Sequence, residues 1–247
     1  LLSRRQRQMC IRDRDYIVTK VARFPFDKFS DASNKLGTQM KATGEVMSIG
    51  RTMEESLLKA VRSLETGVCH IYHKKFDKWS NDDLLAYIKG GTDDRLYAIG
   101  QLIRNGVDLA LIYDKTKIDM FFLEKFKNIV EFENVVRAHP MDVETLRAAK
   151  RMGFSDKYIG QLWGLSQNEM YRLREKNNVF PVYKMIDTCA SEFASYVPYF
   201  YSTYEEENES IVSGKEKIIV LGSGPIRIGQ GVEFDYSTVH AIWSIRA

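Results

Sequence analysis

The stretch MDVETLRAAKRMGFSDKYIGQLWGLSQNEMYRLREKN, residues 141–177, carries three short helical patterns in succession. Its apolar residues recur at intervals of three and four, which is the spacing of one face of an α-helix. Gly153 and Gly164 separate the patterns, and Ser166 and Glu169 have the spacing of a capping box before the third. We therefore expect helices at 142–152, 155–163 and 166–176.

Helical patterns also fill the sequence before this stretch. Thr52 and Glu55 form a capping-box pattern ahead of an amphipathic run that ends at Gly67. Further helices are expected at 80–90, 93–105 and 119–137. Many amphipathic helices with short connections indicate an α-helical domain in which helix packs on helix.

Both flanks of the helical region have a different pattern. Before it, DYIVTKVARF (15–24) and GEVMSIG (44–50) favour strands. After it, VFPVYKMID (179–187) favours an extended chain, YSTYEEENES (201–210) a polar linker, IIVLG (218–222) a buried strand, and DYSTVHAIWSIRA (235–247) a helix. The expected fold class is mainly α with partial α/β pieces at both ends. Since one strand and one helix cannot bury each other, we expect the sequence to be cut at both ends.

Charge and cysteine usage restrict the class of protein. The formal net charge is +3, but residues 1–14 carry five arginines and one aspartate, so the rest of the chain carries a net −1. We expect residues 1–14 to be an artefactual or disordered tail, and the remainder has no electrostatic footprint for nucleic acid. Three scattered cysteines indicate a reducing compartment. No apolar run is long enough to suggest a membrane span.

The glycine-rich stretch VLGSGPIRIGQG, residues 220–231, resembles a phosphate loop but fails both spacing rules. The dinucleotide pattern GxGxxG has Arg227 in place of its third glycine, and the Walker A pattern has Gln230 in place of its lysine. What remains is an arginine among glycines, ahead of a helix, which suits a carboxylate-like or phosphate-like anion. A tight turn without any ligand is the alternative.

Five segments together resemble the large chain of carbamoyl phosphate synthetase, in the order of that family. They are DYIVTKVARFPFDKF (15–29), TQMKATGEVMSIGRTMEESLLKAVRSLE (38–65), GFSDKYIGQLWGL (153–165), FPVYKMIDTCASEFASYVPYFYSTYEEE (180–207) and VLGSGPIRIGQGVEFDYSTVHA (220–241). The stretch GVCHIYHKKFDKWS (67–80) shows little likeness, and residues 1–14 show none.

The resemblance implies a division of the chain into parts. Residues 15–66 would be the C-terminal end of the first ATP-grasp half, and residues 67–200 the helical oligomerisation domain. Residues 201–215 would form an acidic linker. Residues 216–247 would be the first β-α unit of the pre-ATP-grasp domain of the second half.

The family is a cytoplasmic ligase that serves arginine and pyrimidine biosynthesis. It makes carboxyphosphate from bicarbonate and ATP, then carbamate with ammonia, then carbamoyl phosphate with a second ATP. The resemblance implies ATP with Mg²⁺ or Mn²⁺ in the full-length chain, ammonia from a glutaminase small subunit, and a homo-oligomer formed through the helical domain. Neither nucleic acid nor a membrane is an expected partner. The nucleotide and metal ligands of the family lie outside this segment, so we expect no catalytic or metal-binding residue in it.

The resemblance also implies that part of an internal carbamate tunnel lies here. By motif position the residues that would line or border it are Met40, Glu45, Arg227, Gly231 and Glu233. Carbamate decomposes in water, so a path without solvent prevents the side reaction. Arg227 would stabilise the passing anion, and we expect Glu45 and Glu233 to hold backbone or arginine. Structural ion pairs or helix caps are the alternative for both carboxylates.

Two other functions compete with this interpretation. A helical assembly scaffold without chemistry needs only the helical domain. A helix-turn-helix at 155–177, with Arg172 and Arg174 pointing outward, would bind nucleic acid, although Glu169 and Glu175 and the near-neutral remainder oppose it.

Two smaller motifs have simpler explanations. The motif Cys69-His70-x-x-His73 has too few ligands for a structural zinc site. The pairs Asp82-Asp83 and Asp93-Asp94 are explained as helix caps.

Overall fold

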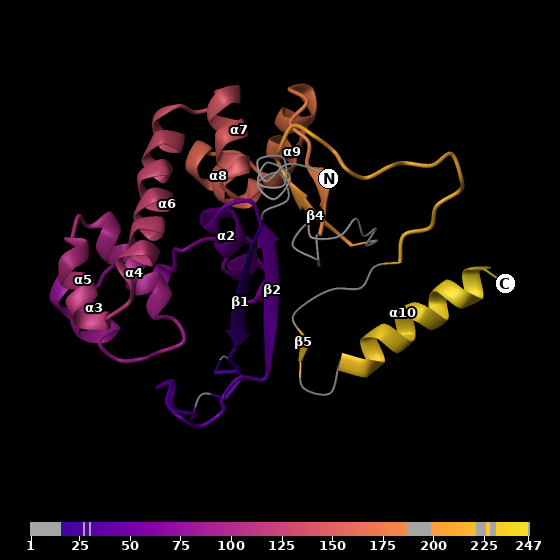
Figure 1. The fold of residues 1–247 in the computed structure, drawn as a ribbon. Helices are drawn as coiled ribbons and strands as arrows, with labels where there is room; N and C mark the ends of the chain where they lie inside the picture. Colours follow the sequence, from indigo (N-terminus) through magenta and orange to yellow (C-terminus); the bar gives the residue numbers. More distant parts are fainter. Residues whose placement is uncertain are drawn as a thin grey trace, which may run out of the picture. The chain divides into compact units, whose positions relative to one another are not determined.

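The computed structural model describes residues 16–246, except for 27, 30, 187–198, 221–225 and 228–230 (Figure 1). Of residues 226, 227 and 231–235 it describes only the backbone. The described chain is mainly α-helical with small sheets, as the sequence predicts. It forms two compact units, and each is described separately: one contains residues 16–19, 49–59 and 131–213, the other residues 20–48, 60–130 and 214–246.

A three-stranded sheet contains strands from distant parts of the sequence. Strands β1 (Ile17–Arg23), β2 (Gly44–Gly50) and β5 (Ile226–Arg227) lie in that order, and β2 is antiparallel to β5. The first two confirm the predicted strands. Helix α2 (Met53–Ser63) follows β2, and Ala60 and Leu64 pack with Val21 and Val46 in a small apolar core.

Most helices of the second unit begin where a polar side chain caps them. Helix α3 (Asn81–Ile88) starts after Ser80, whose hydroxyl accepts a hydrogen bond from the Asp83 amide. Helices α4 (Arg95–Arg104) and α6 (Met120–Ala138) confirm two further predictions. Helix α5 (Leu109–Thr116) and a 3₁₀ turn, η1 (Lys74–Phe76), were not predicted. Helix α3 packs against both α4 and α5, which makes this part a helix-on-helix layer.

The first unit contains the three helices of the opening stretch. They are α7 (Val143–Arg151), α8 (Asp156–Trp163) and α9 (Gln167–Lys176). Gly164 ends α8 with a φ of 72°, and Ser166 and Glu169 form the expected capping box of α9. The indole nitrogen of Trp163 donates a 2.6 Å hydrogen bond to the Val136 carbonyl, which fastens α8 to the second half of α6.

The segment after α9 forms a second sheet. Strand β3 (Val182–Met185) pairs antiparallel with β4 (Phe200–Thr203), with Tyr183 opposite Ser202. Strand β4 thus includes the first residues of the stretch that suggested a polar linker, because the alternate side chains Tyr201 and Thr203 are buried there.

The C-terminal segment differs from the prediction at two points. Residues 218–220 were expected in a buried strand, but they form no strand in the described structure, and Ile219 is 82% exposed. Helix α10 (Gly231–Arg246) begins four residues before the expected start at residue 235. Among the described helices, none is both long enough and apolar enough to cross a bilayer.

Candidate functional site

The pairing of β2 with β5 brings the two glycine-containing motifs of the sequence together. Gly44 lies opposite Arg227, and Glu45 lies opposite Ile226. Cα atoms of directly paired residues in an antiparallel sheet are about 4.5–5.5 Å apart. Two segments that lie more than two-thirds of the chain apart in sequence are therefore neighbours in one sheet. Both carry residues that the family resemblance places along the carbamate tunnel.

Glu45 has a partner that the sequence did not indicate. Its carboxylate oxygen Oε1 lies 2.8 Å from the Lys20 ammonium of β1, and both side chains are about half-exposed. This is a structural ion pair, so the expected bond of Glu45 to backbone or arginine is replaced by one to lysine. Met40 is 83% exposed in the loop before β2. The side chains of Arg227 and Glu233 lie outside the described residues, and Gly231 is the first residue of α10.

The loop that carries Met40 is attached to the turn between α3 and α4. The Leu36 amide donates a 2.6 Å hydrogen bond to the Gly91 carbonyl, and Lys35 forms a β-bridge with Thr92. Within the loop, the Lys41 ammonium donates to the carbonyls of Ser33 and Lys35 at 2.9 and 2.6 Å. The approach to β2 is therefore held by backbone contacts with the helical layer.

A charged and aromatic cluster surrounds Asp94, two residues after Thr92. The Asp94 carboxylate accepts hydrogen bonds from the Tyr87 hydroxyl at 2.5 Å and from the Lys75 ammonium at 2.6 Å. The Lys75 ammonium also lies 4.9, 5.1 and 5.9 Å from the ring centroids of Tyr87, Phe76 and Trp79. Such contacts of a cation with ring faces are attractive. The sequence analysis missed this cluster because it lies in the stretch with little family likeness; the interleaved lysines and aromatics of KKFDKW (74–79) were the available signal.

The cluster changes the protonation of its carboxylates in opposite directions. Burial tends to raise the pKa of Asp94, but hydrogen bonds from Lys75 and Tyr87 outweigh it and hold this pKa below its usual value. Burial and the neighbouring Asp94 charge raise the pKa of Asp93. Burial opposes the charge of Lys75, yet its bonds to Asp94 and Tyr87 raise its pKa overall. Asp94 makes no side-chain cap at the start of α4, so explaining it as a helix cap was wrong.

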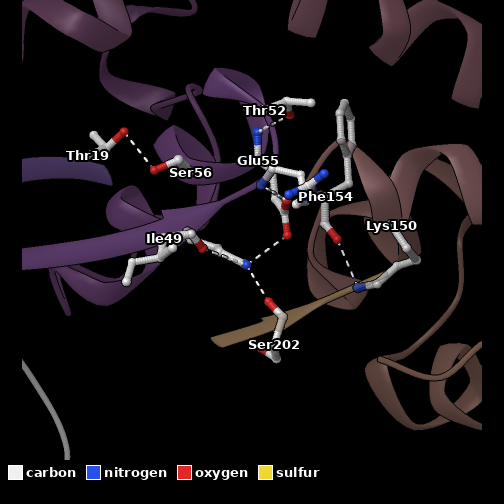
Figure 2. Close-up of polar contacts among 10 residues, drawn as sticks. Thr19, Ile49, Thr52, Glu55, Ser56, Lys150, Phe154 and Ser202 are labelled. Atoms are coloured by element: carbon white, nitrogen blue, oxygen red, sulfur yellow. Dashed lines mark hydrogen bonds and ion pairs between the residues drawn. The ribbon is translucent and has the colours of Figure 1, made fainter. Parts of the chain in front are cut away.

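In the other unit, helix α2 contains an ion pair whose carboxylate is buried (Figure 2). Glu55 accepts a 2.7 Å hydrogen bond from the Arg51 amide and forms a 2.7 Å ion pair with Lys59. The Glu55 amide donates to the Thr52 hydroxyl at 3.2 Å. The predicted capping box is therefore only half formed, because the glutamate reaches the amide of Arg51 instead of that of Thr52.

The helix pair at 155–177 presents only one of the two arginines that the sequence analysis expected to point outward, because Arg172 is exposed and Arg174 is buried. Ile159 is fully buried, as the sequence predicts. Arg174, expected to point outward, is only 8% exposed; it donates to Asp156 at 2.9 Å and to the Val179 carbonyl at 3.1 Å. An arginine occupied in this way cannot contact a phosphate, which weakens the helix-turn-helix hypothesis.

The histidine motif serves local structure in the described chain. The His73 ring nitrogen Nδ1 accepts a 3.1 Å hydrogen bond from the Lys75 amide and caps η1. Cys69 is a free, partly buried thiol. Over the described ranges, no group of three or more His, Cys, Asp or Glu side chains is placed to hold a metal ion. The described side chains therefore do not fit a metal site, and we derive no chemical step through a metal ion.

Comparison with protein families gives two matches. Residues 45–178 match the oligomerisation domain of the carbamoyl-phosphate synthetase large chain. Residues 214–247 match the carbamoyl phosphate synthase preATP-grasp domain. The first match covers more than half of the chain, and it begins at residue 45, inside the segment assigned from the sequence to the end of the first ATP-grasp half. The exact boundary between those two parts stays a prediction.

Proposed function

We propose, since the chain belongs to the carbamoyl phosphate synthetase large-chain family, that it contributes a helical domain and part of a carbamate tunnel wall to a glutamine-dependent synthetase. The family is one of ligases, and the two matched domains follow each other along the chain. In this proposal the large chain that contains these residues makes carbamoyl phosphate from bicarbonate, ATP and ammonia.

The antiparallel pairing of β2 with β5 is the observation that supports the tunnel wall. Carbamate is an anion that water destroys, so its path needs compensating positive charge and exclusion of solvent. Arg227 supplies a fixed positive charge on one strand. On β2, the charge of Glu45 is offset by Lys20 of β1, so this carboxylate repels a passing anion less than an unpaired one would.

Other parts of the same synthetase would supply what the described residues do not. We assign ATP and Mg²⁺ or Mn²⁺ to the ATP-grasp parts of the large chain. Ammonia would come from a glutaminase small subunit in the cytoplasm, and the product would serve arginine and pyrimidine biosynthesis. The matched residues would act here by joining and aligning the two phosphorylating halves.

The helical domain is proposed to associate with a second copy of the chain. The matched domain is described as an oligomerisation domain. Exposed apolar side chains on α5 and the start of α6 favour such a role: Leu111, Tyr113, Phe121 and Phe122. The same observation supports the second candidate function, a helical assembly scaffold without chemistry.

An assay of the large chain containing these residues separates the two functions. Purified with a glutaminase subunit, it should form carbamoyl phosphate from bicarbonate, ATP and glutamine, and it should elute as an oligomer in size-exclusion chromatography. Assembly without product formation would favour the scaffold. Product formation by a strict monomer would remove the self-association proposal and leave the ligase.

A further inference from the structure

The ammonium group of Lys59 joins three chain segments at one point. It pairs with Glu55 of its own helix at 2.7 Å, donates to the Ile49 carbonyl of β2 at 2.8 Å, and donates to the Ser202 carbonyl of β4. The Tyr201 ring centroid lies 5.7 Å from the same nitrogen. Figure 2 shows Glu55, Ile49 and Ser202 converging on this point from α2, β2 and β4.

The residues around the Lys59 ammonium are buried and closely packed. Glu55 is 1% exposed, so its charge needs the Lys59 cation. A Cβ atom on Gly50 would lie 2.9 Å from the Ser56 amide nitrogen, and one on Gly153 would lie 2.8 Å from the Glu55 Cα. The turn before α2 and the turn after α7 therefore both pack closely against the first turn of α2.

The segments that Lys59 joins lie at different places relative to the two matched domains. Ile49 and Lys59 lie near the start of the matched oligomerisation domain, which spans residues 45–178. Ser202 lies in the connection between that domain and the preATP-grasp domain, which starts at residue 214. One lysine thus ties the connection that leads to the second half back to the place where the helical domain begins.

We infer that Lys59 is a positioning residue that keeps the two synthetase halves aligned for carbamate transfer. This inference rests on the proposed function. Lys59 touches no substrate; it acts through the backbone carbonyls of β2 and β4, which it holds at one point. Loss of the ammonium removes the bond between the Ser202 carbonyl and α2, while β4 stays paired with β3 and the covalent path through the helical domain stays intact. Each half then keeps its own chemistry, and transfer of carbamate between them becomes inefficient.

The test uses the complete large chain with its glutaminase subunit and the variant Lys59→Met. Lys184→Met is the matched control, because the Lys184 side chain on the paired strand β3 is also mostly buried, 10% exposed against 19% for Lys59, and pairs with Glu209 at 3.4 Å. In Lys59→Met we expect deuterium exchange of the β4 amides to rise about tenfold. The yield of carbamoyl phosphate per ATP hydrolysed should fall about threefold or more, with bicarbonate-dependent ATP hydrolysis within about twofold of wild type. Lys184→Met should leave the yield unchanged.

The outcomes separate this inference from the proposed function. An unchanged yield in Lys59→Met, in a preparation where Arg227→Met lowers it, overturns the positioning role and leaves the tunnel. An equal fall in the rates of ATP hydrolysis and of carbamoyl phosphate formation, which leaves the yield per ATP unchanged, also overturns it, because a merely structural residue would give that result. If Lys59→Met does not fold, the double variant Glu55→Gln/Lys59→Met removes both charges of the pair. The yield of carbamoyl phosphate per ATP hydrolysed by this double variant then tests the positioning role.

Discussion

The carboxylate of Glu55 and the ammonium of Lys59 lie 2.7 Å apart, one helical turn from each other on α2. Because Glu55 is buried, removing the cation leaves an uncompensated charge in the interior, which costs far more than a surface pair is worth. Lys59→Ala should lower the free energy of unfolding by about 3 kcal/mol, measured by urea denaturation.

The ion pair of Lys20 with Glu45 provides the control for that change. Both of its side chains are about half-exposed, so water screens the interaction. Lys20→Ala should change the free energy of unfolding by less than about 1 kcal/mol. Equal losses in the two variants would contradict the burial argument for Lys59.

Gly153 should tolerate a side chain much less well than Gly164. Both have positive φ, at 93° and 72°, but only at Gly153 would a Cβ meet backbone, 2.8 Å from the Glu55 Cα. Gly164→Ala should cost about 1 kcal/mol of conformational strain, and Gly153→Ala about 3 kcal/mol. Thermal unfolding of the two variants measures the difference, and an equal shift in Tm would show that the close approach to α2 is not tight.

The cluster around Asp94 predicts opposite pH responses for two adjacent carboxylates. The folded-state pKa of Asp94 is lowered, so its stabilising contribution is present above its ordinary pKa near 4 and is lost as pH falls through the lower folded value. The folded-state pKa of Asp93 is raised, so its charge destabilises the fold at neutral pH, and this penalty disappears as pH falls through the raised value.

Two variants measure these responses. Asp94→Asn should flatten the acid loss of stability below about pH 4, and Asp93→Asn should raise stability at pH 7. Urea denaturation at pH 3–7 follows both. If the free energy of unfolding changed with pH in the same direction in both variants, Lys75 and Tyr87 would not be stabilising the charge of Asp94 alone.

Local signals made most of the helical layer predictable. Ser80, Ser155 and Ser166 each accept a hydrogen bond from a backbone amide at the start of their helix, and Gly164 ends α8 where expected, whereas α2 ends at Ser63, four residues before Gly67. Helix α5 was missed because a single cap, Asp108, with an eight-residue segment gives a weak periodic signal.

Contacts between distant residues could not be read from the sequence. Asp94 meets Lys75, 19 residues away, and Arg174 meets Asp156, 18 residues away, and only packing decides these contacts. The pairing of β4 with β3, and of β5 with β2, likewise depends on tertiary structure, because a short strand gains hydrogen bonds only from its neighbour. The residues of the carbamate tunnel were inferred from the family resemblance, and their roles stay predictions.

The most direct test of the tunnel is the yield of carbamoyl phosphate per ATP hydrolysed by the complete synthetase carrying Arg227→Met. Arg172→Met, on the exposed side of α9, is the matched control. The tunnel proposal predicts that Arg227→Met retains bicarbonate-dependent ATP hydrolysis and loses about tenfold or more in yield, because carbamate reaches water before the second phosphorylation. A yield equal to that of Arg172→Met would contradict it.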